Sequence, residues 1–400
     1  MTRGHPHRLV VPADAAATAQ PGVRRRWWSN WPWFAGYAAA AWSACYGALG
    51  LFWALGGAGF PFGEGDPESE EVLILDGARS AVASPIIVAL GVIGVLVGVL
   101  MARGIGRGAL RWVLLTFGWT VAACLCLIIP DYRLLMLLTR IPFIIVSPIF
   151  GMPGGNSVGA FLPWPRLNLL VIVIGGLLWG MAATAYQRRT SDVCDVCGRA
   201  DSASPNWTSP GQALRWGRWA VWVAFTIPCL YAATRIAWAV GWPLGIPRDF
   251  YEENKHSGMF LGGLLIALMA IGGAVLTLGL VQRWGEIYPR WIWFKAGKRV
   301  PPLLAIIPAT IVAVFIIPAG IMEIRMDAIR GLKPEAWAMT WPAWLWPLWG
   351  FALGAATYAY HLRRRTAVCP VCGRGETRPA GQAQPVSTEA RTRSVEAERA

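Results

Sequence analysis

Two stretches of this chain repeat one pattern: "RRTSDVCDVCGR" at residues 188–199 and "RRTAVCPVCGR" at residues 364–374. Each stretch sets arginines directly before a Cys-x-x-Cys-Gly segment. A pattern that returns near the end of each half of a chain indicates an internal duplication, and a duplication fixes how the rest of the sequence is divided.

A second pair of segments supports the duplication. The sequence "YGALGLFWALG" at 46–56 and the sequence "YAATRIAWAVG" at 231–241 share five of eleven positions without a gap. Both continue into turns rich in proline and glycine. Shared motifs at the same place in each half predict two homologous units.

The composition predicts that these units lie in a membrane. Hydrophobic residues make up 55% of the chain and charged residues only 14%, whereas a soluble domain carries roughly 25% charge. The mean hydropathy is +0.45. The 24 Trp and 29 Pro residues fit the same environment, because Trp favours the lipid–water interface and membrane helices tolerate Pro.

Eight segments have the roughly 20 apolar residues that a helix needs to cross a bilayer. They lie near 32–55, 81–102, 112–130, 167–186, 219–241, 259–281, 302–322 and 342–360. Four helices return a chain to its starting side, so the two units would be parallel copies related by an axis along the membrane normal. The predicted fold is an all-α, polytopic transmembrane bundle of about eight helices in two four-helix repeats.

This organisation predicts five parts of the chain. They are a cytoplasmic segment 1–30, a first repeat 31–199, a linker 200–215, a second repeat 216–374 and a disordered tail 375–400, each repeat ending in its CxxC segment. Between the third and fourth helices, residues 141–168 are apolar but interrupted by Pro and Gly. We expect a loop at the outer interface there, or a re-entrant hairpin packed against protein.

The charge pattern predicts the orientation. With both termini inside, 26 of the 36 Lys and Arg residues lie on the inner side, as the positive-inside rule requires. We therefore expect a multi-pass protein of the cell membrane with cytoplasmic termini. Attraction to anionic lipid headgroups accounts for the net charge of +14, and no nucleic acid partner is expected.

The cysteine pairs are the candidate metal ligands. Two CxxCG knuckles supply the four thiolates of a closed structural zinc site, and a reducing cytoplasm keeps them as thiols. The predicted ligands are Cys194, Cys197, Cys369 and Cys372. One structural zinc would join the two halves or two chains. Two alternatives are a thiol redox pair, for which "CPVC" is suitable, and solvated cysteines without a ligand.

The two knuckles must meet for this site to form. Gly176-x-x-x-Gly180 and Gly350-x-x-x-Gly354 lie in the helices that precede the knuckles. Small residues at this spacing let membrane helices approach closely, so these two helices are expected to pack together.

A candidate outer cavity rests on four charged residues. Arg235 lies inside a predicted span, Asp131 and Glu323 follow the third and seventh spans, and Asp327 lies one turn beyond Glu323. Charges in a span are costly and are functional candidates; alternatively, Arg235 snorkels to the interface and the acids mark helix ends. No catalytic motif is present, so the sequence gives no argument for an enzyme.

The turn "WALGGAGFPFG", the segment "WGEIYPRW" followed by "GKRVPPLLAIIPA", and "YHLRRR" before the last CxxCG resemble a group of uncharacterised actinobacterial multi-pass membrane proteins. The similarity covers most of residues 30 to 374. The group has no established activity, so the resemblance implies the membrane topology and no chemistry.

Two functions fit these observations. One is transporter-like handling of a small solute between two pseudo-symmetric halves. The other is a non-enzymatic scaffold or sensor whose zinc-stabilised cytoplasmic face binds a soluble partner. The expected partners are the lipid bilayer and either a second copy of the chain or a cytoplasmic protein.

Overall fold

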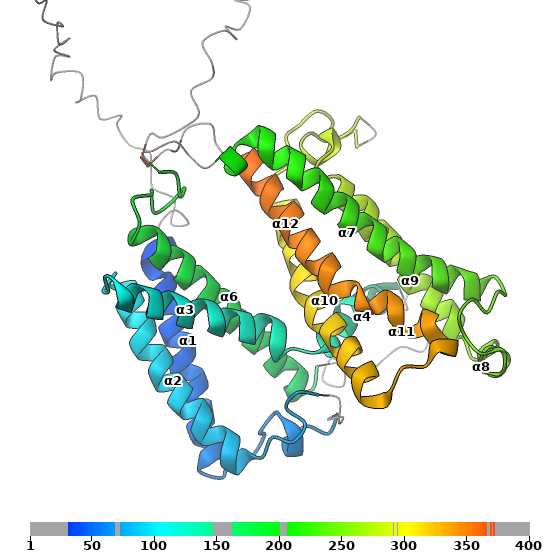
Figure 1. Cartoon of the computed structure of the whole chain (residues 1–400), viewed down its shortest axis with the longest axis horizontal. Coiled ribbons are helices and arrows are strands. Elements are labelled where there is room, and N and C mark those ends of the chain that lie inside the picture. The colour runs from blue at the N-terminus through cyan, green and yellow to red at the C-terminus, as the bar shows by residue number, and fades with distance from the viewer. Residues whose placement is uncertain are drawn as a thin grey trace, which may run out of the picture.

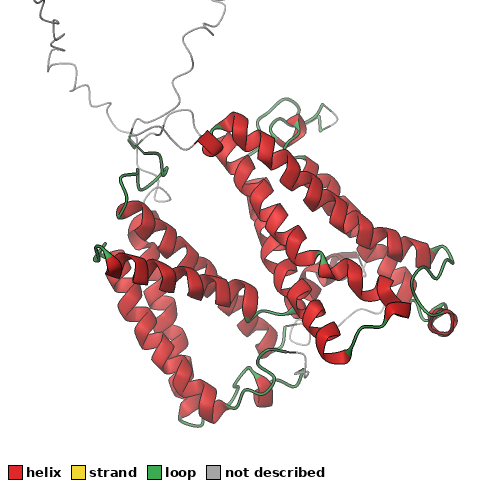
Figure 2. Ribbon diagram, viewed as in Figure 1, coloured by secondary structure: helices red, strands yellow, loops and turns green. Residues whose placement is uncertain are grey.

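The computed structural model of the chain is helical throughout its described part, without a named strand (Figures 1 and 2). The described residues are 31–68, 73–146, 162–200, 206–290, 292, 293, 295–365, 369, 371 and 372. The predicted segments 1–30 and 375–400 lie outside them.

The described residues form eight long helices and three shorter ones in chain order, with 3-10 turns between some of them. The first group is α1 (Trp31–Ala54), α2 (Ser80–Ala102), α3 (Ala109–Ala123) with its π-helical continuation η4 (Cys124–Ile128), α4 (Tyr132–Val146) and α6 (Trp164–Arg189). The second group is α7 (Pro210–Ala239), α8 (Arg248–Asn254), α9 (Met259–Leu278), α10 (Pro302–Arg330), α11 (Trp337–Trp344) and α12 (Trp346–Arg364). Each of the eight predicted segments corresponds to a helix, or in one case to the pair α11 and α12.

Six of the described helices are long and apolar enough to span a membrane: α2, α3 with η4, α6, α7, α9 and α10. This finding supports a multi-pass membrane protein. The other two predicted spans fall short for different reasons. Helix α1 is rich in Trp, Tyr and Gly, while α12 carries His361, Arg363 and Arg364 in its last turn, which lowers its hydrophobicity.

The order of helix neighbours is the same in both groups. Helix α1 packs against α2 and α6, and α6 packs against α3. In the second group α7 packs against α9 and α12, and α12 packs against α10. Figure 1 shows the first set on the left and the second on the right. We call these sets the first unit (α1, α2, α3, α6) and the second unit (α7, α9, α10, α12).

The first helix of each unit ends in the same hydrogen-bonded turn. The N–H groups of Gly56 and Gly57 donate to the carbonyls of Trp53 and Phe52, and those of Gly241 and Trp242 donate to Trp238 and Ala237. Gly56 has φ +89° and Gly241 has φ +98°. Glycine accepts this left-handed conformation without a Cβ clash, which is why both helices stop where the repeated "WA-x-G" sequence places a glycine.

Small residues set the contact between α1 and α2. A Cβ atom built on Gly91 would lie 2.7 Å from the Cα atom of Gly47, so the two backbones touch directly at this crossing. Without water in a bilayer, helix association depends on this kind of close packing.

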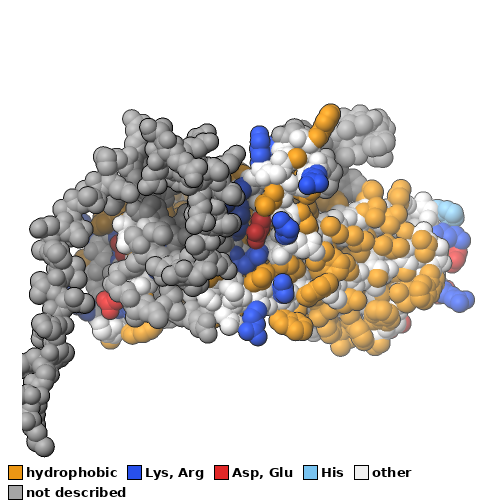
Figure 3. Space-filling model, turned by 90° about the horizontal axis from the view of Figure 1, so that it is seen from above, with side chains coloured by type: hydrophobic (Ala, Val, Ile, Leu, Met, Phe, Trp, Pro, Cys, Tyr) orange, Lys and Arg blue, Asp and Glu red, His pale blue; other side chains and the backbone are white. Residues whose placement is uncertain are grey.

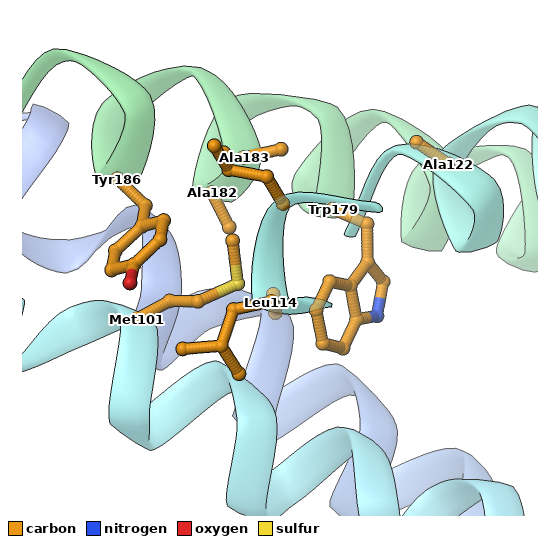
Figure 4. Packing of buried hydrophobic residues seen from close by; sticks show 9 residues of the cluster. Met101, Leu114, Ala122, Trp179, Ala182, Ala183 and Tyr186 are labelled. Carbon is orange, nitrogen blue, oxygen red and sulfur yellow. The ribbon is translucent and has the colours of Figure 1, made fainter. Parts of the chain in front are cut away.

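The core of the first unit lies where α6 meets α2 and α3. Trp179 and Tyr186 of α6 are fully buried against Met101 and Leu114 (Figure 4). In the second unit Tyr360 of α12 has the corresponding place, buried beside Val221 of α7. Each large aromatic side chain fixes the last helix of its unit to the others.

Helix α4 was not predicted. It occupies Tyr132–Val146 and packs against α10, so that Leu134 and Leu137 lie in one apolar cluster with Val314 and Phe315 of the second unit. The expectation of an irregular segment from residue 141 is therefore wrong for 141–146; residues 147–161 lie outside the described part. Strong amphipathicity, rather than uniform hydrophobicity, distinguishes this helix from a span.

Two expectations about helix boundaries also need correction. Helix α10 continues to Arg330, so Glu323 and Asp327 lie within it and do not follow it. Helix α7 begins at Pro210, inside the range predicted as a linker.

The glycines expected to join α6 to α12 face other partners. A Cβ atom on Gly176 would meet Cys126 of η4, and one on Gly350 would meet Ile316 and Ile317 of α10. Both glycines thus serve packing inside their own unit, because the neighbouring helix of the same unit is the one that approaches closely.

On the face shown in Figure 3, hydrophobic side chains cover much of the second unit, and Lys and Arg lie toward its edges. Helix α9 alone exposes Met259, Leu261, Leu265, Leu268, Met269, Val275 and Leu276. A surface this apolar is suited to hydrocarbon rather than to water.

Candidate metal centre

The first knuckle follows directly from the end of α6. An isolated antiparallel bridge between Val193 and Ala200 joins the two ends of this knuckle. The Cys194 N–H donates to the Arg199 carbonyl at 2.9 Å. The Gly198 N–H donates to the Cys194 carbonyl at 2.7 Å. Gly198 has φ +70°, so the glycine of CxxCG permits the tight turn that points both thiols to one side.

The second knuckle follows α12 and brings Cys369 and Cys372 to the first. The Sγ atoms of all four predicted ligands lie within 4.8 Å of one another. Cys194 and Cys369 are buried, while Cys197 and Cys372 are half-buried. The four sulfur atoms therefore surround one shared point, and in the described residues they form the only such group of metal-binding side chains.

The spacing fits a tetrahedral ion. The Cys197 and Cys372 sulfur atoms are 3.7 Å apart. Four sulfurs bound to zinc at about 2.3 Å would be separated by about 3.8 Å in a tetrahedron. A disulfide requires about 2.05 Å, and none of the described cysteines is in a disulfide.

Cys197 and Cys369 differ in how readily their thiols ionise. Burial raises the pKa of the Cys197 thiol to about 12. Burial also opposes ionisation of Cys369, but the backbone N–H groups of Cys372 and Val371 donate to its sulfur and lower its pKa to about 7. Backbone amides directed at a thiolate are the second shell that a thiolate-bound metal requires.

Arginine side chains brace the first knuckle from α6. Arg188 Nη1 donates to the Val196 carbonyl at 2.9 Å, within the CxxC turn, and its guanidinium lies 5.4 Å from the Trp31 ring centroid. Arg188, the first arginine of the repeated pattern, thus holds the first CxxC turn by a hydrogen bond to its backbone.

A matching pair of contacts anchors the helices that carry the knuckles. The Tyr186 hydroxyl donates to the Ile105 carbonyl at 2.9 Å, in the loop between α2 and α3. The Tyr360 hydroxyl donates to the Gly285 carbonyl at 2.7 Å, in the loop between α9 and α10. Each knuckle is therefore held to its own unit by a contact that does not involve the thiols.

The four residues predicted to line an outer cavity are divided between two places. Asp131 pairs with Arg133 at 2.6 Å, and Arg133 also pairs with Asp66 at 2.6 Å. These three residues line a pocket of about 30 Å³ against Met322 and Arg325 of α10. Arg235, Glu323 and Asp327 are not among the residues that line it.

Arg235 lies instead against α11. Its guanidinium donates to the Ala338 carbonyl at 2.8 Å and the Met339 carbonyl at 3.2 Å, and it lies 4.2 Å from the Trp238 ring centroid. Asp327 accepts a hydrogen bond from Trp344 Nε1 at 2.8 Å. Arg235 therefore satisfies carbonyls in the first turn of α11.

The ion pairs around Asp131 were not predicted from the sequence. Arg133 and Asp66 are both buried, and Arg166 pairs with Glu68 at 2.6 Å beside them. Two features of the sequence could have indicated these ion pairs: the acidic loop of residues 63–77 and the Asp-Tyr-Arg sequence at 131–133. A buried charge needs a partner of the opposite sign.

Two of the four histidines, His5 and His7, lie outside the described residues. His256 is exposed in the turn after α8, and His361 stacks on Tyr358 at the end of α12. Cys45, Cys124, Cys126 and Cys229 lie in helices, away from the knuckles.

No protein-family model, curated protein or solved structure matches this chain. The resemblance to actinobacterial multi-pass membrane proteins rests on the motifs alone and stays a prediction.

Proposed function

We propose that the protein is a membrane scaffold whose two four-helix units are fastened by one structural zinc ion on Cys194, Cys197, Cys369 and Cys372. The observation that carries the proposal is the distance of at most 4.8 Å among four sulfur atoms that come from two knuckles, 175 residues apart. A site closed by four protein ligands has no open position for a substrate, so the ion would stabilise the structure and would not catalyse a reaction.

The donor set favours zinc. Four thiolates in a tetrahedral arrangement are typical of zinc and of iron–sulfur sites. Sulfur atoms within 4.8 Å of one another leave room for a single ion and not for a cluster with bridging sulfides. Both knuckles have the CxxCG form that supports a closed zinc site.

The place of the site in the fold supports a scaffold. Helix α4 connects the units by packing on α10, while the knuckles connect them at the ends of α6 and α12. An ion at the second connection would restrain the units relative to each other. Arginines beside the knuckles give this face a positive charge that would favour an acidic soluble partner.

Metal analysis of the purified full-length protein tests the proposal. We expect about one zinc per chain, and a large loss of zinc in Cys372→Ser because a closed site requires its fourth ligand. Cys45→Ser is the matched control, since Cys45 lies in α1, outside the cluster. Less than about half an equivalent of zinc in the wild type, with all four knuckle thiols open to titration, would rule out the proposal.

A transporter-like role is the second candidate. The pocket between Asp131, Arg133 and α10 supports it, because charged groups lie there between the two units. Its volume of about 30 Å³ admits about one water molecule, which makes a scaffold the better-supported function. Unchanged solute uptake by cells that carry Asp66→Asn and Asp131→Asn, both in the lining of this pocket, would remove this second candidate.

A further inference from the structure

A large cavity lies within the first unit, and its lining residues are outside the two CxxC knuckles. It has a volume of about 930 Å³ and is lined almost entirely by apolar side chains. Its walls are α2 and α3, and its floor is formed by α1 and α6, including Trp42, Tyr46 and Trp179. Pockets of about 300–1,000 Å³ are the usual size for small-molecule ligands.

The cavity opens sideways between two helices that suit a membrane. Figure 1 shows α2 and α3 diverging from the short loop that joins them, and both are among the six candidate spans. Large side chains on both walls remain exposed at the opening: Ile86 and Leu90 on α2, Trp112 and Val113 on α3. In a bilayer this opening faces hydrocarbon, so a lipid chain can enter without crossing water.

The length of the cavity corresponds to one lipid chain. Lining residues of the α3 wall extend from Trp112 to Cys124, about 18 Å along a helix. The hydrocarbon of one leaflet is about half of the 30 Å bilayer core. The π-helical turn η4 begins at Cys124, and such turns are frequent at functional sites.

Positive charge lies at the narrow end of the cavity. Arg103 and Arg107 are exposed on the loop that joins α2 to α3. Arg111 lies 5.1 Å from the centroid of the Trp112 ring, which lines the cavity mouth. An anionic headgroup beside this loop would be attracted by these arginines, and Trp112 has the amphipathic character of an interface residue.

We propose that this cavity binds one acyl chain of an anionic phospholipid, with the phosphate at the Arg103–Arg111 loop and the chain against Trp42 and Trp179. Ordinary annular lipid contacts a convex helix surface, whereas here four helices surround the chain. The proposal is independent of the zinc clasp, since no cavity residue belongs to the knuckles.

Photolabelling of the purified full-length protein in nanodiscs tests the site. The probes are phosphatidylglycerol and phosphatidylcholine that carry the same acyl-chain diazirine, and labelled residues are mapped by mass spectrometry. We expect label on the cavity segments of α2 and α3, with phosphatidylglycerol favoured about fivefold for each arginine that it contacts. Arg103→Gln should lower that preference about fivefold, the share of one arginine, and leave the label in the cavity.

Filling the cavity supplies the matched comparison. Thr120→Trp places a large ring in the cavity from an exposed lining position, and Ala123→Trp places the same ring on an exposed position of α3 that does not line it. Thr120→Trp should lower the label on α2 at least about fivefold by displacing methylene contacts, and Ala123→Trp should leave it unchanged. Zinc content should be normal in both variants, which separates a lost lipid site from a failed clasp or fold.

Two results would overturn the proposal. One is label spread over α2 and α9 in proportion to their exposure, with no headgroup preference and equal effects of the two tryptophans. The other is crosslinking between the α3 helices of two copies with no lipid label on the cavity walls, which would assign the opening to a second copy of the chain.

Discussion

The sulfur atoms of Cys197 and Cys372 lie 3.7 Å apart although 175 residues separate them in the chain. Each belongs to a knuckle held by its own unit, through Tyr186 on one side and Tyr360 on the other. The contact between the thiols is therefore also a contact between the two units, and the metal occupancy of this site should be reflected in the stability of the whole protein.

Removing the metal should expose thiols and lower stability together. After chelation we expect four more cysteines to react with a thiol reagent and a lower melting temperature, because metal binding contributes to the free energy of folding. One equivalent of zinc should restore both properties. Thiol titration and thermal unfolding before and after chelation check this, and unchanged values after complete metal loss would contradict it.

Tyr186→Phe and Tyr360→Phe should each destabilise the protein by about 1–2 kcal/mol, because each leaves a carbonyl without its buried donor. The two effects should add, since the residues lie in different units. Tyr358→Phe is the control, as its side chain is exposed. The measurement is denaturant unfolding in detergent; an effect of Tyr358→Phe as large as the other two would argue against a role of the hydroxyl bonds.

Arg133→Met should cost about 3–5 kcal/mol, because it leaves the buried carboxylates of Asp66 and Asp131 without their partner. Arg166→Gln should cost less, since its partner Glu68 is 35% exposed and water can replace the lost charge. Comparison of the two unfolding free energies checks the order. A larger loss of unfolding free energy for Arg166→Gln would show that burial does not determine how much these ion pairs contribute to stability.

Gly91→Ala should destabilise the contact between α1 and α2 by about 1–3 kcal/mol, because the new Cβ would overlap the Gly47 backbone. Gly272→Ala in α9 meets nothing within 4 Å and should be neutral or gain up to about 1 kcal/mol in helix propensity. Thermal unfolding of the two variants in the same detergent distinguishes them. Equal changes in melting temperature for the two variants would mean that α1 and α2 do not cross as closely as the structure indicates.

Helix positions were largely predictable from sequence, because about 20 apolar residues in a row have few other stable conformations in lipid. The meeting of Cys194, Cys197, Cys369 and Cys372 was predictable as well, since CxxCG has a characteristic local geometry and the duplication placed both copies on one side.

What sequence reasoning missed depends on contacts between distant segments. Helix α4 contains charged residues and so has no span signal, yet its apolar face packs on Val314 and Phe315. Asp131 was recognised as unusual, but its partner Arg133, which Asp131 shares with Asp66, became apparent only when the loop before α2 and the start of α4 came together. The cavity between α2 and α3 depends on the angle between two helices, which no local pattern specifies.

A metal bridge from residue 197 to residue 372 would also change the connectivity of the molecule. The chain between these two cysteines, which are 175 positions apart and enclose the whole second unit, would become a closed ring. A single backbone cut anywhere in that ring would leave the fragments attached to each other through the ion. A nicked protein should therefore migrate as one particle while its metal is bound and separate into two pieces only under chelating, denaturing conditions.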